Sequence, residues 1–444
     1  MEVKQFYDKS LAHGSYAIKS AGEIALIDPE RDPQKYFDYA KEQNAKIVGV
    51  IETHPHADFV SSHLEIARRT GAIIFTSKLT AADYPHQTFD DGDVITVGKV
   101  KLKAINTPGH SPDSISIVME DENGNEQAVF TGDTLFVGDV GRPDLRESAG
   151  ALRAKREELA AQMYDTIHNK LWKLDDDTLV YPAHGPGSLC GKAMGSELYS
   201  TIGREKKNNY ALQPMSKDEF VTTLLHDQPF VPKYFGYDVS VNKSGAENLE
   251  ESISQVPRLN GKDDIKENIL IVDTRSRDEY TKGHLKNSIN IPDALRFETW
   301  LGSIVSPNEE FYLVATNESA RERMIRRAAK IGYEKNIRGV LIAPHTEVTS
   351  PKLDTHDFDA NKENYFILDV RNESEVKDNK IFGNSKNIPL HQLRERINEI
   401  ETNKPIVIHC AGGYRSGVAA SIVEKYKIGI KVYDLGAAVK SYRS

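Results

Sequence analysis

Short apolar runs bounded by turn residues alternate with helical patterns over the first 245 residues. Runs of this kind, rich in Val and Ile, are typical of buried strands, and they occur at residues 17–18, 24–27, 46–51 and 72–75. A helical pattern spans Ser62 to Arg69, and a longer amphipathic one spans Arg153 to Leu174. This order predicts an α/β domain with many strands. The mixed polar segment from Asn242 to Asp264 reads as a linker or a loosely packed connection.

The remainder of the chain contains an internal repeat. An apolar run ending in Asp-x-Arg occurs twice, at residues 269–275 and 366–371. Each copy continues with Asn-Ile-Pro, at 290–292 and 387–389, and then with an apolar run that precedes Arg321 or Arg415. Each copy thus predicts a strand, a second short strand, and then a strand, a loop and a helix. This order is typical of a small α/β domain. The predicted domains are therefore 1–245, 246–345 and 346–444, in keeping with about 150 residues per domain.

Composition narrows the class of protein. The formal net charge of −9 argues against a nucleic-acid binder, which needs a basic face. No stretch approaches about 18 apolar residues, so no membrane-spanning helix is expected, and the start of the chain shows no secretory signal. The sequence holds two cysteines, Cys190 and Cys410, too few for a disulfide framework. We therefore expect a cytoplasmic protein whose cysteines are reduced.

Histidine and aspartate gather in four loops that each follow an apolar strand. Loops on one edge of a sheet are where sites are usually built. Isolated histidines are often surface or capping residues, but four clusters bracketed by Gly and Pro favour a metal site. Histidine with carboxylate oxygen suits Zn, Fe(II) or Mn. The candidate residues are His54, His56, Asp58, His110, Asp133 and His184.

This set of motifs resembles the metallo-β-lactamase superfamily over about residues 1–245. The resemblance implies an αββα sandwich whose loops line the metal crevice. Dinuclear hydrolases of the superfamily, such as glyoxalase II, carry a histidine directly after the aspartate of the first motif. Here that place is Phe59, whose ring cannot ligate a metal. The donors left for a first metal are His54, His110 and Asp133, which is the two-histidine, one-carboxylate pattern of mononuclear non-haem Fe(II) oxygenases.

The sequence around these ligands, at 52–58 and 136–144, resembles the persulfide dioxygenase branch. The resemblance implies one Fe(II) per chain, held by the three residues just named. The surrounding residues, which would hydrogen-bond ligands or iron-bound oxygen species, are His56, Asp58 and His184. Arg142 is a candidate contact for a carboxylate of the thiol that carries the persulfide, with a surface salt bridge as the alternative.

Cys410 begins a glycine-bearing loop, residues 410–415, between an apolar strand and a helical run from Val418 to Lys425. Backbone N–H groups at Gly412 and Gly413, together with the start of the helix, would form an anion-binding nest. The start of the helix and the positive charge of Arg415 would lower the pKa of a cysteine thiol in this loop, which favours the thiolate. The nest would also stabilise a persulfide on that sulfur. Tyrosine phosphatases use a similar Cys-to-Arg loop to bind phosphate, although here four residues separate Cys410 from Arg415, and the loop alone leaves both chemistries open.

The rest of each copy resembles rhodanese. Asp369-Val370-Arg371, the later Asn-Ile-Pro and the six-residue loop carry this resemblance in the second copy. That copy lacks a Gly-His pair, which the first copy has at 283–284. In the first copy Thr316 stands in place of the cysteine, its loop has no glycine, and Glu318 would repel an anion. The resemblance implies a rhodanese fold without the chemistry there, in a spacer or docking role.

Cys190 lies six residues past His184 in a Gly-rich loop. It is either a second persulfide carrier near the iron, with Lys192 lowering the pKa of its thiol, or a small residue packed beneath the loop. The sequence alone leaves both interpretations open.

As a whole the chain is similar to three-domain persulfide dioxygenase–sulfurtransferase fusions. The resemblance implies that a low-molecular-weight thiol persulfide is oxidised with O2 to sulfite, and that Cys410 passes sulfane sulfur to sulfite to give thiosulfate. Such a protein would serve sulfide detoxification, as a homodimer or homotetramer without membrane or nucleic-acid partners. Glutathione, coenzyme A and bacillithiol all remain open as the thiol carrier. The alternatives are a metal-dependent thioesterase of glyoxalase II type with rhodanese modules, and a non-catalytic sulfur carrier or redox sensor.

Overall fold

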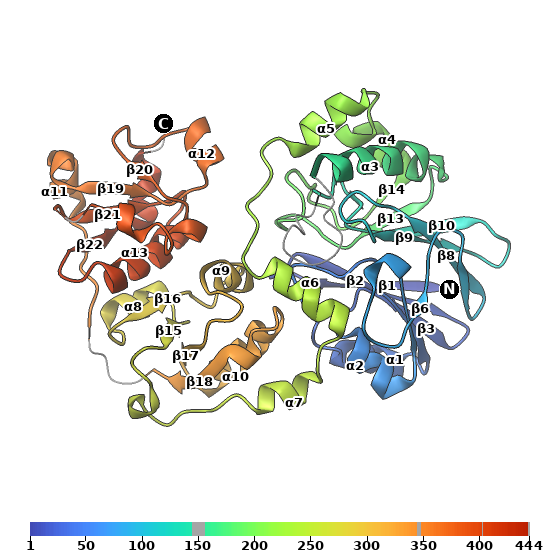
Figure 1. Ribbon diagram of the computed structural model, residues 1–444, viewed down its shortest axis with the longest axis horizontal. Helices are drawn as coiled ribbons and strands as arrows, with labels where there is room; N and C mark the ends of the chain where they lie inside the picture. The colour runs from blue at the N-terminus through green and yellow to red at the C-terminus, as the bar shows by residue number, and fades with distance from the viewer. Residues whose placement is uncertain (144–155, 344–347, 402, 443–444) are drawn as a thin grey trace. The chain divides into compact units, whose positions relative to one another are not determined.

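The computed structural model describes residues 1–143, 156–343, 348–401 and 403–442 (Figure 1). The chain falls into two compact units, Met1–Glu251 with Lys330–Gly332, and Ser252–Ala329 with Tyr333–Ser444. No helix among the described residues has the length and apolar character needed to cross a bilayer.

Two six-stranded sheets form the centre of the first unit. The first sheet has the order β1 (Glu2–Asp8), β2 (His13–Ser20), β3 (Glu23–Ile27), β4 (Lys46–Ile51), β5 (Ile73–Thr76) and β6 (Gln87–Thr88). The second has the order β14 (Ser200–Thr201), β13 (Leu179–Pro182), β10 (Glu126–Gly132), β9 (Ile115–Glu120), β8 (Val100–Asn106) and β7 (Val94–Val97). A small two-stranded sheet pairs β11 (Leu135–Phe136) with β12 (Asp139–Val140).

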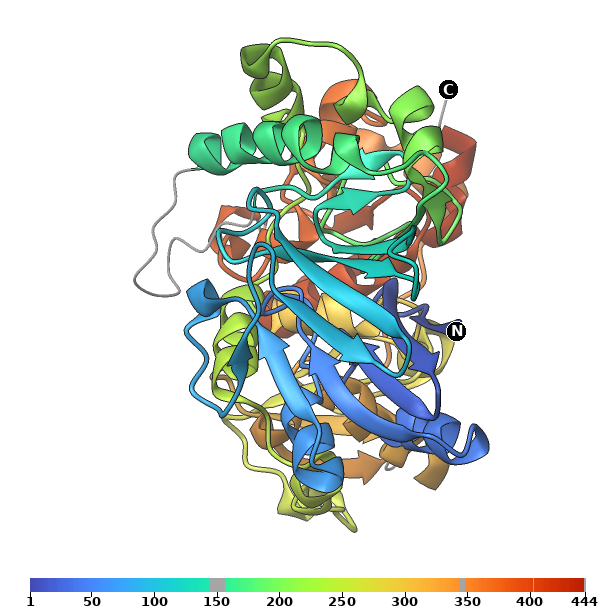
Figure 2. The same cartoon turned by 90° about the vertical axis from the view of Figure 1, so that its right-hand side faces the viewer.

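Helices cover the outer face of each sheet. In Figures 1 and 2, α1 (Gln34–Glu42) and α2 (His63–Thr70) lie outside the first sheet. On the outer side of the second sheet lie α3 (Arg156–Asn169), α4 (Ile202–Asn208) and α5 (Lys217–Leu225). The layers are thus helix, sheet, sheet, helix. The chain continues through α6 (Phe235–Ser244) and α7 (Leu249–Ser254).

Successive side chains of a strand point to opposite faces of its sheet. Here both faces carry apolar side chains, which explains the four layers. Ile18 and Ile27 lie in the core between the two sheets, with Leu102 and Ile117 from the second sheet. Their chain neighbours point outward: Leu26 packs with α1 residues under the first sheet. Each sheet therefore has two buried faces, which is why its strands read as nearly continuous apolar runs.

The second unit holds two four-stranded parallel sheets of identical topology. The first copy has the order β16 (Ser288–Asn290), β15 (Leu270–Asp273), β17 (Phe311–Ala315) and β18 (Ile337–Ile342), with α8 (Arg277–Lys282), α9 (Phe297–Ile304) and α10 (Glu318–Ala329). The second copy has the order β20 (Lys386–Asn387), β19 (Phe366–Asp369), β21 (Ile406–His409) and β22 (Val432–Asp434), with α11 (Thr355–Ala360), α12 (Glu373–Asp378) and α13 (Tyr414–Tyr426). The predicted repeat is confirmed.

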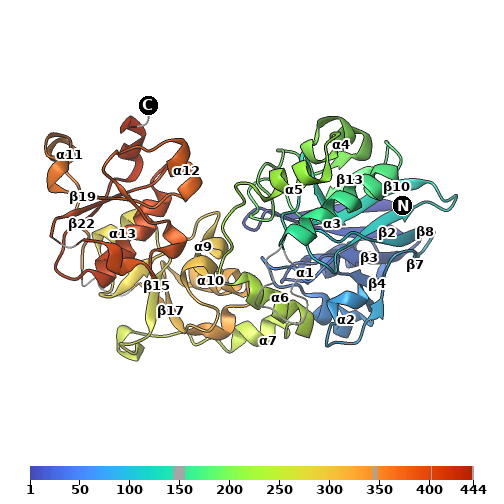
Figure 3. The ribbon, with the colours of Figure 1, turned by 45° about the horizontal axis from the view of Figure 1, so that its top comes forward.

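The two copies contact one another directly. Helix α13 of the second copy lies beside the sheet of the first (Figure 3), where the Asn290 backbone N–H donates to Ser421 Oγ over 2.8 Å. Arg394 of the second copy pairs through both Nη atoms with Glu309 of the first, at 2.7 and 2.8 Å. The copies are therefore joined by specific polar contacts within this unit.

The predicted helix at 62–69 is confirmed as α2, whereas the predicted helix from Arg153 to Leu174 ends as α helix at Asn169, and residues 153–155 lie outside the described residues. The predicted linker from Asn242 to Asp264 is wrong at its start. Asn242 is a buried residue of α6, and α7 follows it. Polar side chains misled the prediction because Asn242 is buried for its hydrogen bonds rather than for apolar packing.

Candidate metal centre and sulfur-transfer loop

His54, His110 and Asp133 come together from three strand ends, after β4, β8 and β10. One ligand-type atom from each lies within 4.8 Å of the others, and all three side chains are buried. Asp133 Oδ2 lies 3.6 Å from His110 Nε2 and 4.0 Å from His54 Nε2. Two imidazole nitrogens therefore face one carboxylate oxygen.

Hydrogen bonds at the far side of each ring orient the two histidines. His110 Nδ1 lies 2.7 Å from the Arg142 carbonyl oxygen, so Nδ1 carries the proton and donates it. His54 Nδ1 lies 3.1 Å from Thr53 Oγ1, whose own proton goes to Asp28 Oδ2. The hydroxyl oxygen must then accept from His54 Nδ1. In both rings the Nε2 lone pair is left to face Asp133, which is the tautomer that a metal ligand needs.

The chemistry of this donor set fits a metal cation. Asp133 is 1% exposed, and no hydrogen bond from the described residues reaches either of its carboxylate oxygens. A buried carboxylate without hydrogen bonds is costly unless a cation compensates it. Two histidine nitrogens and one carboxylate oxygen would supply that cation with three ligands.

The other predicted histidines and Asp58 also lie close to these ligands, and the His56 ring is 4.1 Å from the His54 ring, centroid to centroid. His184 Nε2 is 3.4 Å from both Asp133 Oδ1 and Asp58 Oδ2. His56 Nε2 is 3.2 Å from Asp28 Oδ1. The ring of Phe59 packs against the His56 ring, with centroids 4.4 Å apart. The apolar ring of Phe59 therefore lies beside His56, one of these additional polar residues.

Two residues near this centre, His13 and Asp28, were not predicted from the sequence. His13, at the start of β2, packs on Phe59 with ring centroids 4.0 Å apart, and burial holds the pKa of His13 well below its usual value. Asp28 accepts from the Thr53 backbone N–H and hydroxyl, both over 2.8 Å. Neither residue belongs to a recognisable motif. Only the pairing of β2 with the His184 loop brings His13 to the site.

Cys190 is buried next to Asp58 and His184. Burial and the carboxylates of Asp133 and Asp58 raise the pKa of the Cys190 thiol to about 12. The expected effect of Lys192 is wrong, since its Nζ donates to the Thr223 and His226 carbonyls over 2.6 and 3.1 Å. These two hydrogen bonds hold the Lys192 ammonium group at the C-terminal end of α5. A role for Cys190 as a persulfide carrier stays a prediction.

Arg142 is 3% exposed, so its side chain does not lie at the surface. Its Nη1 donates to the Pro229 and Phe230 carbonyls over 2.6 and 3.3 Å. Its backbone joins two parts of the site, because the carbonyl orients His110 and the N–H donates to the Cys190 carbonyl over 2.9 Å. Contact with a thiol carrier stays a prediction.

Cys410 lies between β21 and α13, at the base of a loop that closes around its sulfur. The Gly413 N–H donates to Cys410 Sγ over 3.1 Å. Gly413 has a φ of +110°, and a Cβ there would meet the Gly436 backbone at 3.1 Å, so a side chain is disfavoured. A Cβ on Gly412 would meet nothing within 4 Å. The backbone thus provides at least one donor to the sulfur.

The partly exposed Arg415 pairs with a carboxylate. Its Nη1 and Nη2 donate to the two carboxylate oxygens of Glu375, over 2.5 and 2.7 Å. Glu375 also forms the capping box at the start of α12 with Asn372. The guanidinium charge near Cys410 is therefore largely compensated by Glu375.

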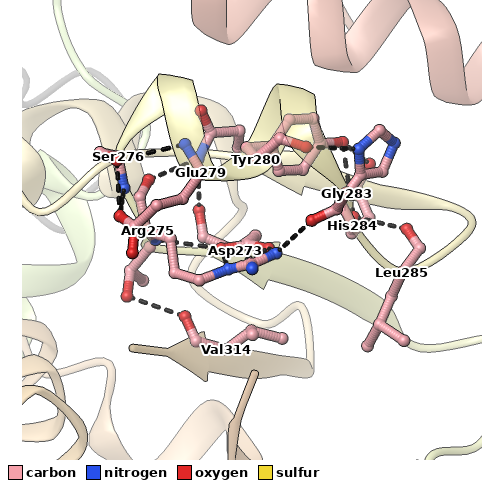
Figure 4. Close-up of polar contacts among 12 residues, drawn as sticks. Asp273, Arg275, Ser276, Glu279, Tyr280, Gly283, His284, Leu285 and Val314 are labelled. Carbon is pink, nitrogen blue, oxygen red and sulfur yellow. Dashed lines mark hydrogen bonds and ion pairs between the residues drawn. The ribbon is translucent and has the colours of Figure 1, made fainter. Parts of the chain in front are cut away.

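The first copy preserves the scaffold around this site without the thiol. Figure 4 shows Arg275 paired with Asp273, which Arg371 and Asp369 repeat in the second copy. His284 stacks on Tyr280 with ring centroids 3.9 Å apart (Figure 4). Buried Asp-x-Arg pairs fix the strand-to-helix turn in both copies. The pair is structural, and only the second copy adds a nucleophile.

Comparisons with known proteins match this description. Residues 11–184 match the metallo-beta-lactamase superfamily, and residues 256–340 and 354–442 each match the rhodanese-like domain. The crystal structure of a metallo-beta-lactamase from Staphylococcus aureus subsp. aureus COL is 33% identical, with a TM-score of 0.71, over 77% of this chain and 99% of that one.

Two kinds of curated relative match the first domain. Human mitochondrial persulfide dioxygenase ETHE1 is 30% identical over 248 residues, which cover 54% of this chain and 87% of that protein. The cytoplasmic hydroxyacylglutathione hydrolase of Arabidopsis thaliana is 33% identical over 174 residues, 38% of this chain and 62% of that protein.

The chain belongs to the metallo-beta-lactamase superfamily of metal-binding enzymes. More particularly, its first domain is a homologue of the ETHE1 persulfide dioxygenases, and tandem rhodanese-like domains follow it. The expected fold class, an αββα sandwich followed by two rhodanese-like α/β domains, is confirmed.

Proposed function

We propose that this chain is a non-haem Fe(II) persulfide dioxygenase coupled to a rhodanese sulfurtransferase. The observation that carries the proposal is the convergence of His54, His110 and Asp133, with the apolar ring of Phe59 where a dinuclear hydrolase would have a further nitrogen donor. The homology to persulfide dioxygenases and the tandem rhodanese-like domains support it. The proposed boundaries of its three domains are 1–245, 246–345 and 346–444.

One Fe(II) per chain would be held by His54 Nε2, His110 Nε2 and an Asp133 oxygen. When bound, it supplies open positions at which a persulfide sulfur and O2 react. The protein contributes ligand orientation, because Thr53 and the Arg142 carbonyl fix the two histidine rings. His56, Asp58 and His184 lie beside these ligands as hydrogen-bonding groups for the oxidised sulfur. Arg142 remains the proposed contact for the thiol carrier.

Cys410 would perform the second reaction. Its thiolate attacks the sulfane sulfur of a persulfide, an S–S bond forms on Cys410, and the carrier leaves as a thiolate. Sulfite then attacks the outer sulfur, the new S–S bond breaks, and thiosulfate departs as the Cys410 thiolate is restored. The N–H groups of Gly412 and Gly413 are the proposed anion donors, aided by Arg415. Cys190 is a proposed second carrier of persulfide sulfur.

The test uses the full chain prepared without oxygen, supplied with a low-molecular-weight thiol persulfide and then with O2. Oxygen uptake, sulfite and thiosulfate are measured with iron and zinc content. His54→Ala should lose iron and oxygen uptake. Cys410→Ser should retain oxygen uptake while sulfite replaces thiosulfate. Thiosulfate formed undiminished by Cys410→Ser would refute the transfer step.

A metal-dependent thioesterase of glyoxalase II type with rhodanese modules is the alternative, favoured by the similarity to hydroxyacylglutathione hydrolase. Two zinc ions per chain, hydrolysis of a glutathione thioester and no persulfide-dependent oxygen uptake would establish it. For the dioxygenase we further propose a cytoplasmic location and a homodimer or homotetramer. Fractionation of cells and sedimentation of the purified chain test these two points.

A further inference from the structure

The turn between β1 and β2 leads directly to a histidine of the metal centre. Asp8 Oδ1 folds this turn, because it accepts from three N–H and hydroxyl groups later in the turn, over 2.8, 2.7 and 3.2 Å. The turn ends at Ala12, which has a φ of +52°, a value that residues other than glycine rarely adopt. The Ala12 carbonyl lies 3.2 Å from His184 Nδ1, and His184 Nε2 lies 3.4 Å from Asp133 Oδ1. The conformation of the turn therefore sets the direction of the His184 ring.

The second carboxylate oxygen of Asp8 is held by Lys330, in the connection that follows α10. Lys330 Nζ forms an ion pair with Asp8 Oδ2 and donates to Ser10 Oγ over 3.2 Å. The side chains of Lys330 and Asp8 are 23% and 9% exposed, and the two residues are 322 positions apart in sequence. Burial by itself would raise the pKa of Asp8, but the charge of Lys330 outweighs it and holds this pKa below its usual value. Removing Lys330 therefore leaves a largely buried carboxylate without its cation.

The backbone next to Lys330 supports a second loop of the metal centre. The Lys330 carbonyl accepts from the Val60 N–H over 2.8 Å. Gly332 has a φ of +68°, and a Cβ there would meet the Tyr237 ring at 2.9 Å and Val60 Cγ2 at 3.2 Å. The connection thus packs closely against Val60, which ends the loop that begins at His54.

This connection is part of the Cys-less copy in sequence. The rhodanese-like match covers residues 256–340, yet Lys330–Gly332 belong to the compact unit formed by residues 1–251. The helix before the connection and the strand after it, α10 and β18, belong to the other unit. The Cys-less copy therefore contributes three residues to the metal-binding unit, which a spacer role does not require.

We propose that Lys330, supplied by the Cys-less copy, is a positioning residue of the metal centre. Its ammonium group holds the Asp8 turn that orients His184, and its carbonyl holds the end of the loop that begins at His54. The copy that lacks the cysteine thereby completes the metal-binding unit. The proposal concerns how the side chains of the centre are held, so it stands whichever metal or reaction the centre serves.

Hydrogen exchange of the full chain without metal, followed at single amides by mass spectrometry, tests the ammonium group. Lys330→Met removes the charge from a side chain of similar length. The Gly185 amide, which donates to the Ala12 carbonyl over 2.9 Å, should then exchange about tenfold faster, because a lost hydrogen bond to a charged group weakens local structure by about this factor. Amides of β8 and β9, in the same unit, should keep their rates. Lys9→Met, at an exposed lysine of the same turn, is the matched control and should change neither.

Metal release is the second measurement. Each variant is loaded without oxygen, in separate series with Fe²⁺ and with Zn²⁺, and release to a chromogenic chelator is timed while circular dichroism confirms the fold. Lys330→Met should release the metal about tenfold faster, the low end of the effect of groups that orient metal ligands. Lys330→Arg keeps the charge and should stay within about threefold of the unaltered chain. Asp8→Asn should match Lys330→Met, and the double variant should be no worse, because both changes break one contact.

The carbonyl contact is tested by Gly332→Ala, whose Cβ would press on Val60. The Val60 amide should exchange about tenfold faster in this variant. Gly71→Ala is the matched control, because Gly71 has a similar φ of +76° but a Cβ there would meet nothing within 4 Å. It should leave the Val60 amide unchanged, and an equal effect of the two variants would refute the carbonyl contact.

An unchanged Gly185 amide in Lys330→Met would overturn the proposal. So would faster exchange shared equally by β8 and β9, because Lys330 would then stabilise the whole unit rather than position one turn. Metal release as slow as in Lys9→Met, or as fast in Lys330→Arg as in Lys330→Met, would count equally against it. Additive effects of Asp8→Asn and Lys330→Met would refute the path through Asp8. Oxygen uptake with persulfide reports separately on the proposed dioxygenase, so either idea can fail while the other stands.

Discussion

Asn242 is predicted to be a main anchor of the loop that carries His56 and Asp58. Its Nδ2 donates to the carbonyls of His56 and Phe59 over 2.8 and 2.7 Å, and its Oδ1 accepts from the Ser61 N–H over 2.8 Å. Asn242 is 1% exposed. Helix α6 thereby fixes a loop that is 181 or more residues away in sequence.

The magnitude follows from what Asn242→Ala leaves behind. Two carbonyls and one N–H each lose a buried partner, at about 1–3 kcal/mol per group. Because the smaller side chain leaves room for water, the low end applies, and we expect a loss of about 3 kcal/mol in the free energy of unfolding. Asn242→Asp should cost more, since it places a carboxylate oxygen against two carbonyl oxygens. Both variants should also retain less metal.

The assay uses the two tryptophans, which lie in different units: Trp172 in the first and Trp300 in the second. In a Trp300→Phe background, urea unfolding followed by fluorescence reports on the first unit alone, which avoids treating the whole chain as two-state. The matched control is Ser240→Ala on the exposed side of α6, where the hydroxyl donates to the Gly236 carbonyl. That control should change stability by less than about 0.5 kcal/mol. An Asn242→Ala effect equally small, or an Asp variant more stable than the Ala variant, would refute the reasoning.

Three further predictions follow from single contacts. Gly141→Ala should lower metal content, measured by elemental analysis, because a Cβ there would overlap the Asp133 carbonyl; full occupancy would count against it. Glu375→Gln should speed alkylation of Cys410 by iodoacetamide at neutral pH, because the Arg415 charge is then uncompensated; slower alkylation would contradict this. Burial raises the pKa of Glu424 from 4.5 to about 6, so the folded chain binds that proton more tightly, and its stability falls as pH rises between these values. Glu424→Gln should remove this fall and stabilise the second unit by about 2 kcal/mol near pH 7, as followed by Trp300 fluorescence; an unchanged pH profile would refute it.

Features carried by local chemistry were predictable from the sequence. Apolar runs such as 46–51 and 24–27 became strands because both faces of each sheet are buried. The four histidine and aspartate loops were placed together because each follows a strand. The repeat was visible because Asp-x-Arg pairs fix the same turn in both copies. In each case the signal lies within a few consecutive residues.

Features that depend on the path of the chain were not predictable. Asn242 is polar, and a buried polar residue breaks the apolar periodicity by which helices are found. His13 reaches the site only because β2 pairs with the His184 loop. Lys192 is close to Cys190 in sequence, yet its ammonium group binds carbonyls at 223 and 226. Closeness in sequence does not determine which way a long side chain points.

The Cys-less copy has lost more than a thiol. Asp273 pairs with Val314 as Asp369 pairs with His409, so Ala315 lies where Cys410 lies, and the sequence-based choice of Thr316 is one residue off. Helix α10 begins at Glu318, three residues after Ala315, whereas α13 begins at Tyr414, four residues after Cys410. The Oδ1 atom of Asn317 accepts a hydrogen bond from the Ala320 N–H over 2.9 Å. Helix therefore occupies the part of the loop in which Gly413 turns its N–H toward sulfur at a φ of +110°. A cysteine placed at Ala315 would meet a capped helix rather than an anion nest, so the fold of this copy, and not only its sequence, separates it from sulfur transfer.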